Sequence, residues 1–114
     1  MKLIIGNTPV EVQWECNESM QALKEIAKDG LTVQLSMFGS FEQFGPLGHQ
    51  LPSHDTEITT QSGDIMLFCG DQIVVFYGSN TWAYTRLGRI IDRSQDEMRE
   101  LLGRGDVTIT VTQE

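Results

Sequence analysis

Three side chains in the middle of the chain have the types and the spacing of a ligand-binding group. Trp82, Tyr84 and Arg86 alternate along a stretch rich in β-branched and aromatic residues. In an extended strand, alternate side chains point to the same face, so these three should lie side by side. Two flat rings and a planar guanidinium can hold a peptide or an aromatic ligand by stacking and hydrogen bonding. The spacing therefore predicts a binding site, with Phe41 and Phe44 from the preceding long loop as further members.

A purely structural explanation of the same residues remains open. Trp82 would then cover the apolar core, and Arg86 would pair with a carboxylate such as Glu42 rather than with a ligand. The two explanations differ in the effect that they predict for Arg86→Lys. A guanidinium that stacks or forms two parallel hydrogen bonds cannot be replaced by lysine, whereas a surface ion pair tolerates the exchange.

Other reactive residues give weaker patterns. His49 and His54 lie five residues apart in a proline-containing loop, with Asp55 and Cys69 as the nearest further ligands. This spacing fits neither a helix face nor a zinc finger, so no metal site is predicted. Cys69 and the second cysteine, Cys16, lack the spacing of a redox pair, and each ends a predicted strand, where a buried reduced thiol is expected. No phosphate loop or dinucleotide fingerprint is present, and no cofactor is predicted.

Composition narrows the classes of partner. The chain has 114 residues and a formal net charge of −8. Such a chain repels phosphate groups, so neither nucleic acid nor an anionic membrane surface is an expected partner. No apolar run approaches the ~18 residues of a membrane span. The first apolar run, at 3–5, is too short for a secretory signal, so a cytoplasmic location is expected. The length suits a single domain over 1–114.

The elements that must position the candidate residues are organised around a hairpin. Two apolar runs, 64–69 and 72–77, flank the pair Gly70-Asp71, which is the usual sign of a tight β-turn. Neither run alternates between polar and apolar residues. Strands that are apolar on both faces are covered on both sides, so this hairpin is predicted to form the centre of the core.

The rest of the chain predicts further strands and two short helices. One helix should start at Asn17 or Ser19 and reach about residue 29, and the capping-box pattern that starts at Ser94 predicts the other, through Leu102. Segment 38–55 has no periodicity and is interpreted as a long binding or packed loop. The other expected strands are 2–5, 9–15, 31–37, 83–91 and 106–112, with 57–60 as a further short one.

These elements predict a mostly β fold. A closed β-barrel of seven to eight strands, with the two short helices covering its open ends, would leave no exposed sheet edges. It would also explain strands that are apolar on both faces, because one face would point into the barrel and the other would lie beneath a helix. The expected fold class is therefore a closed barrel.

A family resemblance leads to the same fold. The run Tyr-Gly-Ser-Asn-Thr-Trp-Ala-Tyr-Thr-Arg-Leu-Gly at 77–88, with Gly-Asp-Ile at 63–65, resembles the small bacterial cyclophilin-like domain proteins. The resemblance extends over nearly the whole chain and implies a cyclophilin-type barrel. It implies no established reaction. Some relatives are joined to flavodoxin-like modules, so the resemblance suggests a flavodoxin-like protein as a partner.

The isomerase site of true cyclophilins does not transfer to this chain. That site uses an arginine followed closely by a Phe-Met-x-x-Gly-Gly type segment, and no arginine precedes Arg86 here. The expected function is therefore a non-catalytic or weakly active cyclophilin-like domain that binds a peptide or small ligand at the barrel rim. The alternative is an enzyme with residual peptidyl-prolyl isomerase activity or an unspecified hydrolase-like activity, to which no catalytic residue can be assigned.

Overall fold

The predicted central hairpin is present in the computed structural model, which describes residues 1–113. Strands β8 (Asp64–Phe68) and β9 (Gln72–Phe76) pair antiparallel, with Phe68 opposite Gln72. The turn between them places two successive residues at positive φ, 55° at Cys69 and 74° at Gly70. Glycine adopts this conformation without strain, which explains the position of Gly70.

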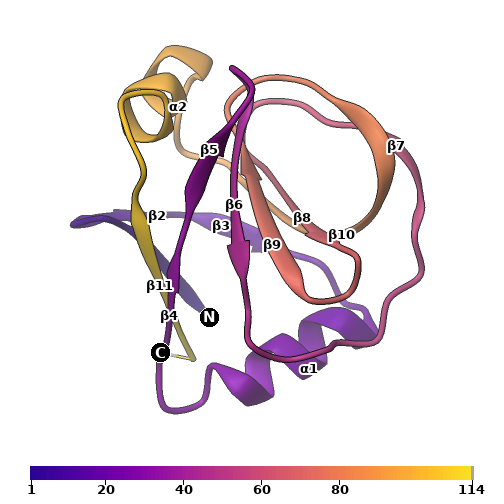
Figure 1. The fold of residues 1–114 in the computed structure, drawn as a ribbon. Helices are drawn as coiled ribbons and strands as arrows, with labels where there is room; N and C mark the ends of the chain where they lie inside the picture. The colour runs from indigo at the N-terminus through magenta and orange to yellow at the C-terminus, as the bar shows by residue number, and fades with distance from the viewer. Residues whose placement is uncertain (114) are drawn as a thin grey trace.

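Strands make up most of the remaining regular secondary structure (Figure 1). The two helices are α1 (Glu18–Ile26) and α2 (Gln95–Leu102). The other strands are β1 (Lys2–Ile5), β2 (Thr8–Val10), β3 (Val12–Trp14), β4 (Leu31–Gln34), β5 (Ser36–Phe38), β6 (Glu42–Pro46), β7 (Thr56–Thr59), β10 (Thr81–Ile90) and β11 (Thr108–Thr112).

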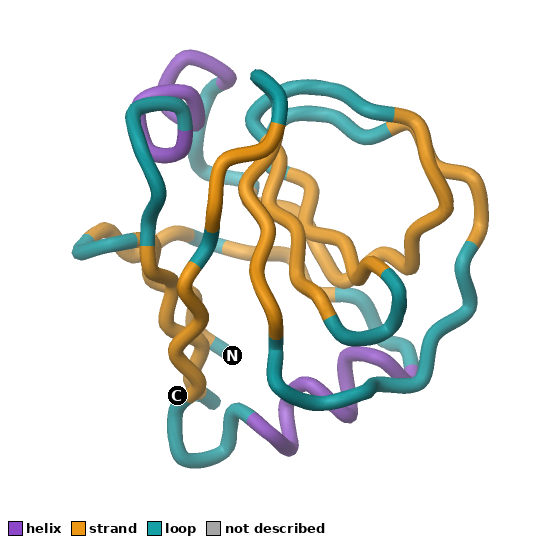
Figure 2. The backbone as a smooth tube through the Cα atoms, viewed as in Figure 1, coloured by secondary structure: helices purple, strands orange, loops and turns teal. Residues whose placement is uncertain are grey.

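The strands form two antiparallel sheets. A four-stranded sheet has the order β2-β1-β11-β4, and the larger sheet has the order β3-β10-β8-β9-β6-β5, with β7 paired to β10. In Figure 1, β7 lies on the opposite side of the molecule from β4 and β11, and α1 runs along the lower end of both sheets. Figure 2 shows that the segment joining β6 to β7 passes over α1 as a loop.

The prediction of a closed barrel is wrong. Within residues 1–113 the terminal strands of each order are not paired with one another, so both sheets are open. The described residues also form eleven strands rather than seven or eight. Mostly β structure with two helices is confirmed, but the inference from doubly apolar strands to closure does not hold. Those strands are covered in a different way.

Two separate clusters cover the two faces of the central hairpin. Ile65 and Ile73 belong to a main core that includes residues of both sheets and both helices. Met66 and Phe76, which point to the other face, pack with Tyr84 in a second, mostly aromatic cluster. Burial on both faces is what makes β8 and β9 continuously apolar. The second cluster forms the floor of the site described below.

The helices begin where the sequence predicts. The Asn17 side chain accepts a hydrogen bond from the backbone N–H of Met20, which caps α1. Ser94 and Glu97 form the reciprocal capping box that starts α2. Neither helix of the described part has the length and apolar character needed to cross a bilayer.

Candidate functional site

A cavity of about 400 Å³ lies on the aromatic face of the larger sheet. Four of the five residues predicted to bind ligand, namely Phe41, Phe44, Trp82 and Tyr84, line it, and Arg86 is not among its lining residues. The full lining consists of Phe38, Phe41, Glu42, Phe44, Phe68, Val74, Asn80, Trp82 and Tyr84. The structure therefore brings together the rings that the sequence singles out, and adds a carboxyl and an amide.

The β5–β6 hairpin supplies one wall of the cavity. Residues 38–55 were expected to lack regular structure, but 42–46 form β6, with Phe38 opposite Glu42. Alternation along β6 places Glu42 and Phe44 on the cavity side. Gln43 points the other way, and its amide binds the backbone oxygens of Leu102 and Gly105. These bonds hold β6 against the end of α2 and fix which side chains face the cavity.

The aromatic rings of this wall contact one another edge to face. The Phe38 ring lies 6.0 Å from the Phe41 ring and 6.0 Å from the Phe44 ring, with interplanar angles of 87° and 86°. The backbone oxygen of Phe41 accepts hydrogen bonds from the N–H groups of Tyr77 and Gly78. A Cβ at position 78 would lie only 2.9 Å from the Phe41 Cβ, so glycine permits this close approach.

The opposite wall comes from β10 and the residues just before it. The Tyr84 ring is 3% exposed, and its centre lies 5.6 Å from that of Phe76. Its hydroxyl accepts a hydrogen bond from the Asn80 side-chain amide at 2.9 Å. Burial raises the pKa of Tyr84, the Asn80 bond opposes this shift, and the charge of Glu42 adds to it. Trp82 is 60% exposed and lies at the rim of the cavity.

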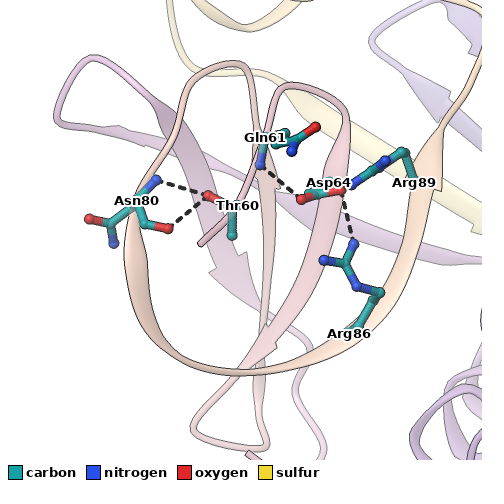
Figure 3. Close-up of polar contacts among 6 residues, drawn as sticks. All are labelled: Thr60, Gln61, Asp64, Asn80, Arg86 and Arg89. Carbon is teal, nitrogen blue, oxygen red and sulfur yellow. Dashed lines mark hydrogen bonds and ion pairs between the residues drawn. The ribbon is translucent and has the colours of Figure 1, made fainter. Parts of the chain in front are cut away.

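Asn80 is fixed from the side away from the cavity. Its backbone N–H donates to the Thr60 hydroxyl, and its backbone oxygen accepts from both the hydroxyl and the N–H of Thr60 (Figure 3). Thr60 is fully buried, so this clamp is rigid. The sequence reasoning did not single out Asn80 as a site residue, although it lies inside the run on which the family resemblance rests.

Glu42 is the ionisable carboxyl of the cavity. It is only 7% exposed, and burial raises its pKa from the ordinary value of 4.5 to about 7. Near neutral pH the group is therefore present in both its protonated and its charged forms. The sequence reasoning considered Glu42 only as an ion-pair partner for Arg86, and the structure gives Arg86 a different partner.

Arg86 binds the carboxylate of Asp64. Asp64 is fully buried, and its Oδ1 accepts from Arg86 Nη1 at 3.0 Å and from Arg89 Nε at 2.7 Å (Figure 3). Its Oδ2 accepts from the backbone N–H of Gln61 at 2.8 Å. The bond to Asp64 raises the pKa of Arg89. Both carboxylate oxygens are thus satisfied, and Asp64 holds two strands and a turn together.

A β-bulge in β10 makes this arrangement possible. Arg86 lies opposite Met66 of β8, and Arg89 lies opposite Asp64, but the register shifts between Arg86 and Gly88. In a regular strand, residues three positions apart point to opposite faces. One extra residue, Leu87, reverses the alternation, so that both arginines reach the same carboxylate.

The other reactive residues of the sequence do not form a site. The His54 ring hydrogen-bonds Glu18 at 2.8 Å, and Asp55 accepts from the Thr85 hydroxyl. Among the residues that the structure describes, no three His, Cys, Asp or Glu side chains are grouped closely enough to hold a metal ion. The expectation of buried thiols is wrong, because Cys16 and Cys69 are both exposed and free. Cys69 lies in the turn after β8 rather than within the strand.

The sequence profile described as the cyclophilin-like family matches residues 3–112. The chain belongs to the cyclophilin-like family. The resemblance read from the 77–88 run is thereby confirmed over almost the full length. No curated protein is significantly similar to the sequence of this cyclophilin-like chain.

Two solved structures are similar to this cyclophilin-like domain in fold. The first is McbB, determined in complex with tryptophan, with a TM-score of 0.72 and 10% sequence identity over 99% of this chain. The chain spans 44% of the McbB chain. The second is the solution structure of a hypothetical protein from Archaeoglobus fulgidus, with a TM-score of 0.67 and 15% identity. That match covers 99% of this chain and 92% of the other.

Proposed function

We propose that this cyclophilin-like domain is a binding module whose aromatic cavity accepts a small ligand, or a peptide side chain, with an apolar ring. The observation that carries the proposal is the cavity itself. Its volume of about 400 Å³ lies in the range of small-molecule sites, which are mostly apolar with a few polar groups. Phe41, Phe44, Trp82 and Tyr84 are proposed to contact the ring.

The arrangement of the polar groups supports binding in a defined orientation. The polar groups of the lining are the Glu42 carboxyl, the Asn80 amide, the Tyr84 hydroxyl and the Trp82 indole N–H, and Asn80 is held in place by Thr60. Pre-organised polar groups in an apolar wall orient a ligand at low entropic cost. McbB provides a further hint, since that protein, similar in fold, holds the small aromatic molecule tryptophan. Neither the family match nor the two similar structures supports a flavodoxin-like partner.

Removing the rim ring tests the proposal. We expect Trp82→Ala to weaken binding of 2-phenylethanol, a neutral ring probe, by about tenfold, because an aromatic contact contributes on the order of 1 kcal/mol beyond the area that it buries. Trp82 is 60% exposed, so the substitution should leave the fold intact. The measurement is a titration followed by the backbone NMR shifts of Asn80 and Tyr84.

Ile91→Ala is the matched control for this titration. Ile91 is 56% exposed and is not part of the cavity lining, so its truncation removes exposed apolar surface elsewhere. It should leave the affinity unchanged. If 2-phenylethanol causes no saturable shifts at Asn80 and Tyr84, or if both variants bind like wild type, the cavity is not the binding site.

Arg86→Lys separates the two explanations of Arg86. In the proposed function Arg86 binds Asp64 and does not contact the ligand. We expect Arg86→Lys to lower the melting temperature by about 4 °C, because the shorter lysine keeps the charge but has no atom at the position from which Nη1 donates to Asp64 Oδ1, at a cost of roughly 1 kcal/mol. Affinity for 2-phenylethanol should be unchanged in the same NMR titration. A variant that melts like wild type yet no longer binds would instead make Arg86 a ligand contact.

A further inference from the structure

We propose that the cavity selects ligands that carry a cationic amine beside an apolar ring, with the Glu42 carboxylate as the counter-ion of the amine. This inference rests on the proposed function, because it assigns the chemical class of the ligand to the same cavity. It also assigns a charge to the ligand, which the proposed function leaves open.

The Glu42 carboxylate lies among aromatic side chains. The residues opposite it across the sheet are Phe38 on β5 and Phe76 on β9, and the Tyr84 ring faces it from β10. Within residues 1–113 no ion pair reaches this carboxylate, the residue is 7% exposed, and its oxygens are not among the fully enclosed polar atoms, so they remain open to the cavity. A buried charge without a partner is costly, and a ligand that brings the partner removes that cost.

The described walls of the cavity carry no cationic side chain. No lysine or arginine is among the described residues that line the cavity. Arg86, the cation nearest in sequence to the aromatic wall, is held by Asp64. An anionic ligand would therefore meet Glu42 and no compensating charge. A cationic ligand would meet Glu42 and the faces of several rings, which attract positive charge. The net charge of −8 also favours the approach of cations.

Proton linkage follows from the same geometry. The pKa of Glu42 is about 7 in the free cavity, and a bound ammonium would hold the group in its charged form and lower that value. Tyr84 is the titratable neighbour from β10, and its raised pKa keeps it neutral over the range concerned. Binding of an amine below pH 7 must therefore release a proton, and the affinity should fall about tenfold per pH unit until the pKa of the bound state is reached.

Three probes of equal ring size test this inference: 2-phenylethylamine, 2-phenylethanol and 3-phenylpropionate, which are a cation, a neutral molecule and an anion. At pH 8 we expect the amine to bind at least about tenfold more tightly than the alcohol, and the propionate to bind least. Between pH 7 and pH 6 the amine should lose about fivefold in affinity, because Glu42 is already half protonated at pH 7, and the alcohol should not. Calorimetry in buffers of different ionisation enthalpy should detect proton release with the amine alone.

Glu42→Gln and Glu57→Gln complete the experiment. The first substitution keeps the shape of the side chain and removes its charge, so amine and alcohol should bind alike and the pH dependence of amine binding should disappear. Glu57 on β7 is exposed and outside the lining, and Glu57→Gln removes the same formal charge, so the tenfold preference should persist.

The outcomes separate this inference from the proposed function. If amine and alcohol bind to wild type equally at pH 8, or if Glu42→Gln keeps the preference for the amine, the charge assignment is overturned while the ring-binding cavity stands. If none of the three probes causes saturable shifts at Asn80 and Tyr84, both proposals fail. Should Glu42→Gln not fold, the pH dependence and proton release of wild type still decide the question.

Discussion

Asp64→Asn is expected to lower the melting temperature by about 10 °C, which corresponds to roughly 2–3 kcal/mol for a domain of this size. Asp64 is fully buried and accepts hydrogen bonds from Arg86, Arg89 and the backbone of Gln61. Asparagine has one acceptor oxygen and no charge, so both ion pairs are lost and one donor loses its partner. Thermal unfolding followed by far-UV circular dichroism measures the effect.

The matched control for this substitution is Asp29→Asn. Asp29 is exposed at the end of the α1 segment, and its exchange should change stability by less than about 0.5 kcal/mol. The two arginines are partly exposed, so they regain water when Asp64 is replaced, and the loss should stay below that of a fully buried pair. A decrease in melting temperature of only about one or two degrees would mean that the free-energy cost of desolvating Asp64 cancels the stabilisation from its hydrogen bonds. The cluster would then contribute to strand register rather than to stability.

The elements that the sequence predicts correctly are those fixed by local chemistry. The hairpin of 64–69 and 72–77 follows from its turn residues, and the start of α2 follows from the Ser94 capping box. Each signal lies within a few residues of the structure that it specifies. No long-range pairing has to be known to recognise it.

The prediction of a closed barrel was wrong because closure depends on pairing between strands that are distant in sequence. The apolar faces of β8 and β9 indicate correctly that both sides are covered, but they do not say by what. In the structure the cover is a main core on one side and an aromatic cluster on the other. The bulge at Leu87 could not be predicted either. Nothing in the sequence from 81 to 90 indicates an extra residue until the pairing of β10 with β8 is known.

The site was predictable to the extent that it depends on alternation. Trp82 and Tyr84 share a face because they are two apart in a strand, and both line the cavity. Glu42 was recognised only as an ion-pair candidate, because the interpretation of 38–55 as irregular concealed the alternation of Glu42 and Phe44 along β6. The available signal was Gly39, which adopts a φ of 60° in the turn that joins β5 to β6.

Glu42→Gln is expected to remove a large contribution to the pH dependence of folding. The pKa of Glu42 rises from 4.5 in the unfolded state to about 7 in the folded state, so between these values the folded state binds more protons. The free energy of unfolding contributed by this group is therefore highest below pH 4.5 and falls as the pH rises to about 7. The total decrease should be about 3 kcal/mol.

The quantity to measure is the difference in unfolding free energy between Glu42→Gln and wild type, obtained from urea titrations between pH 4 and pH 8.5. Other ionisable groups titrate alike in the two proteins and cancel. The amide does not titrate, so the difference should rise in favour of Glu42→Gln by about 3 kcal/mol between pH 4.5 and pH 7 and then level off. Any packing cost of the amide shifts the whole curve without changing its shape.

Glu57→Gln provides the reference curve, because it makes the same chemical change at an exposed position outside the cavity. A flat curve for Glu42→Gln would mean that water reaches the Glu42 carboxylate in the folded protein. The cavity would then be wet at that wall, and an amine would gain little by displacing the water. A curve that rises as expected, together with equal binding of amine and alcohol, would place the buried carboxyl in the cavity wall but beyond the reach of the ligand.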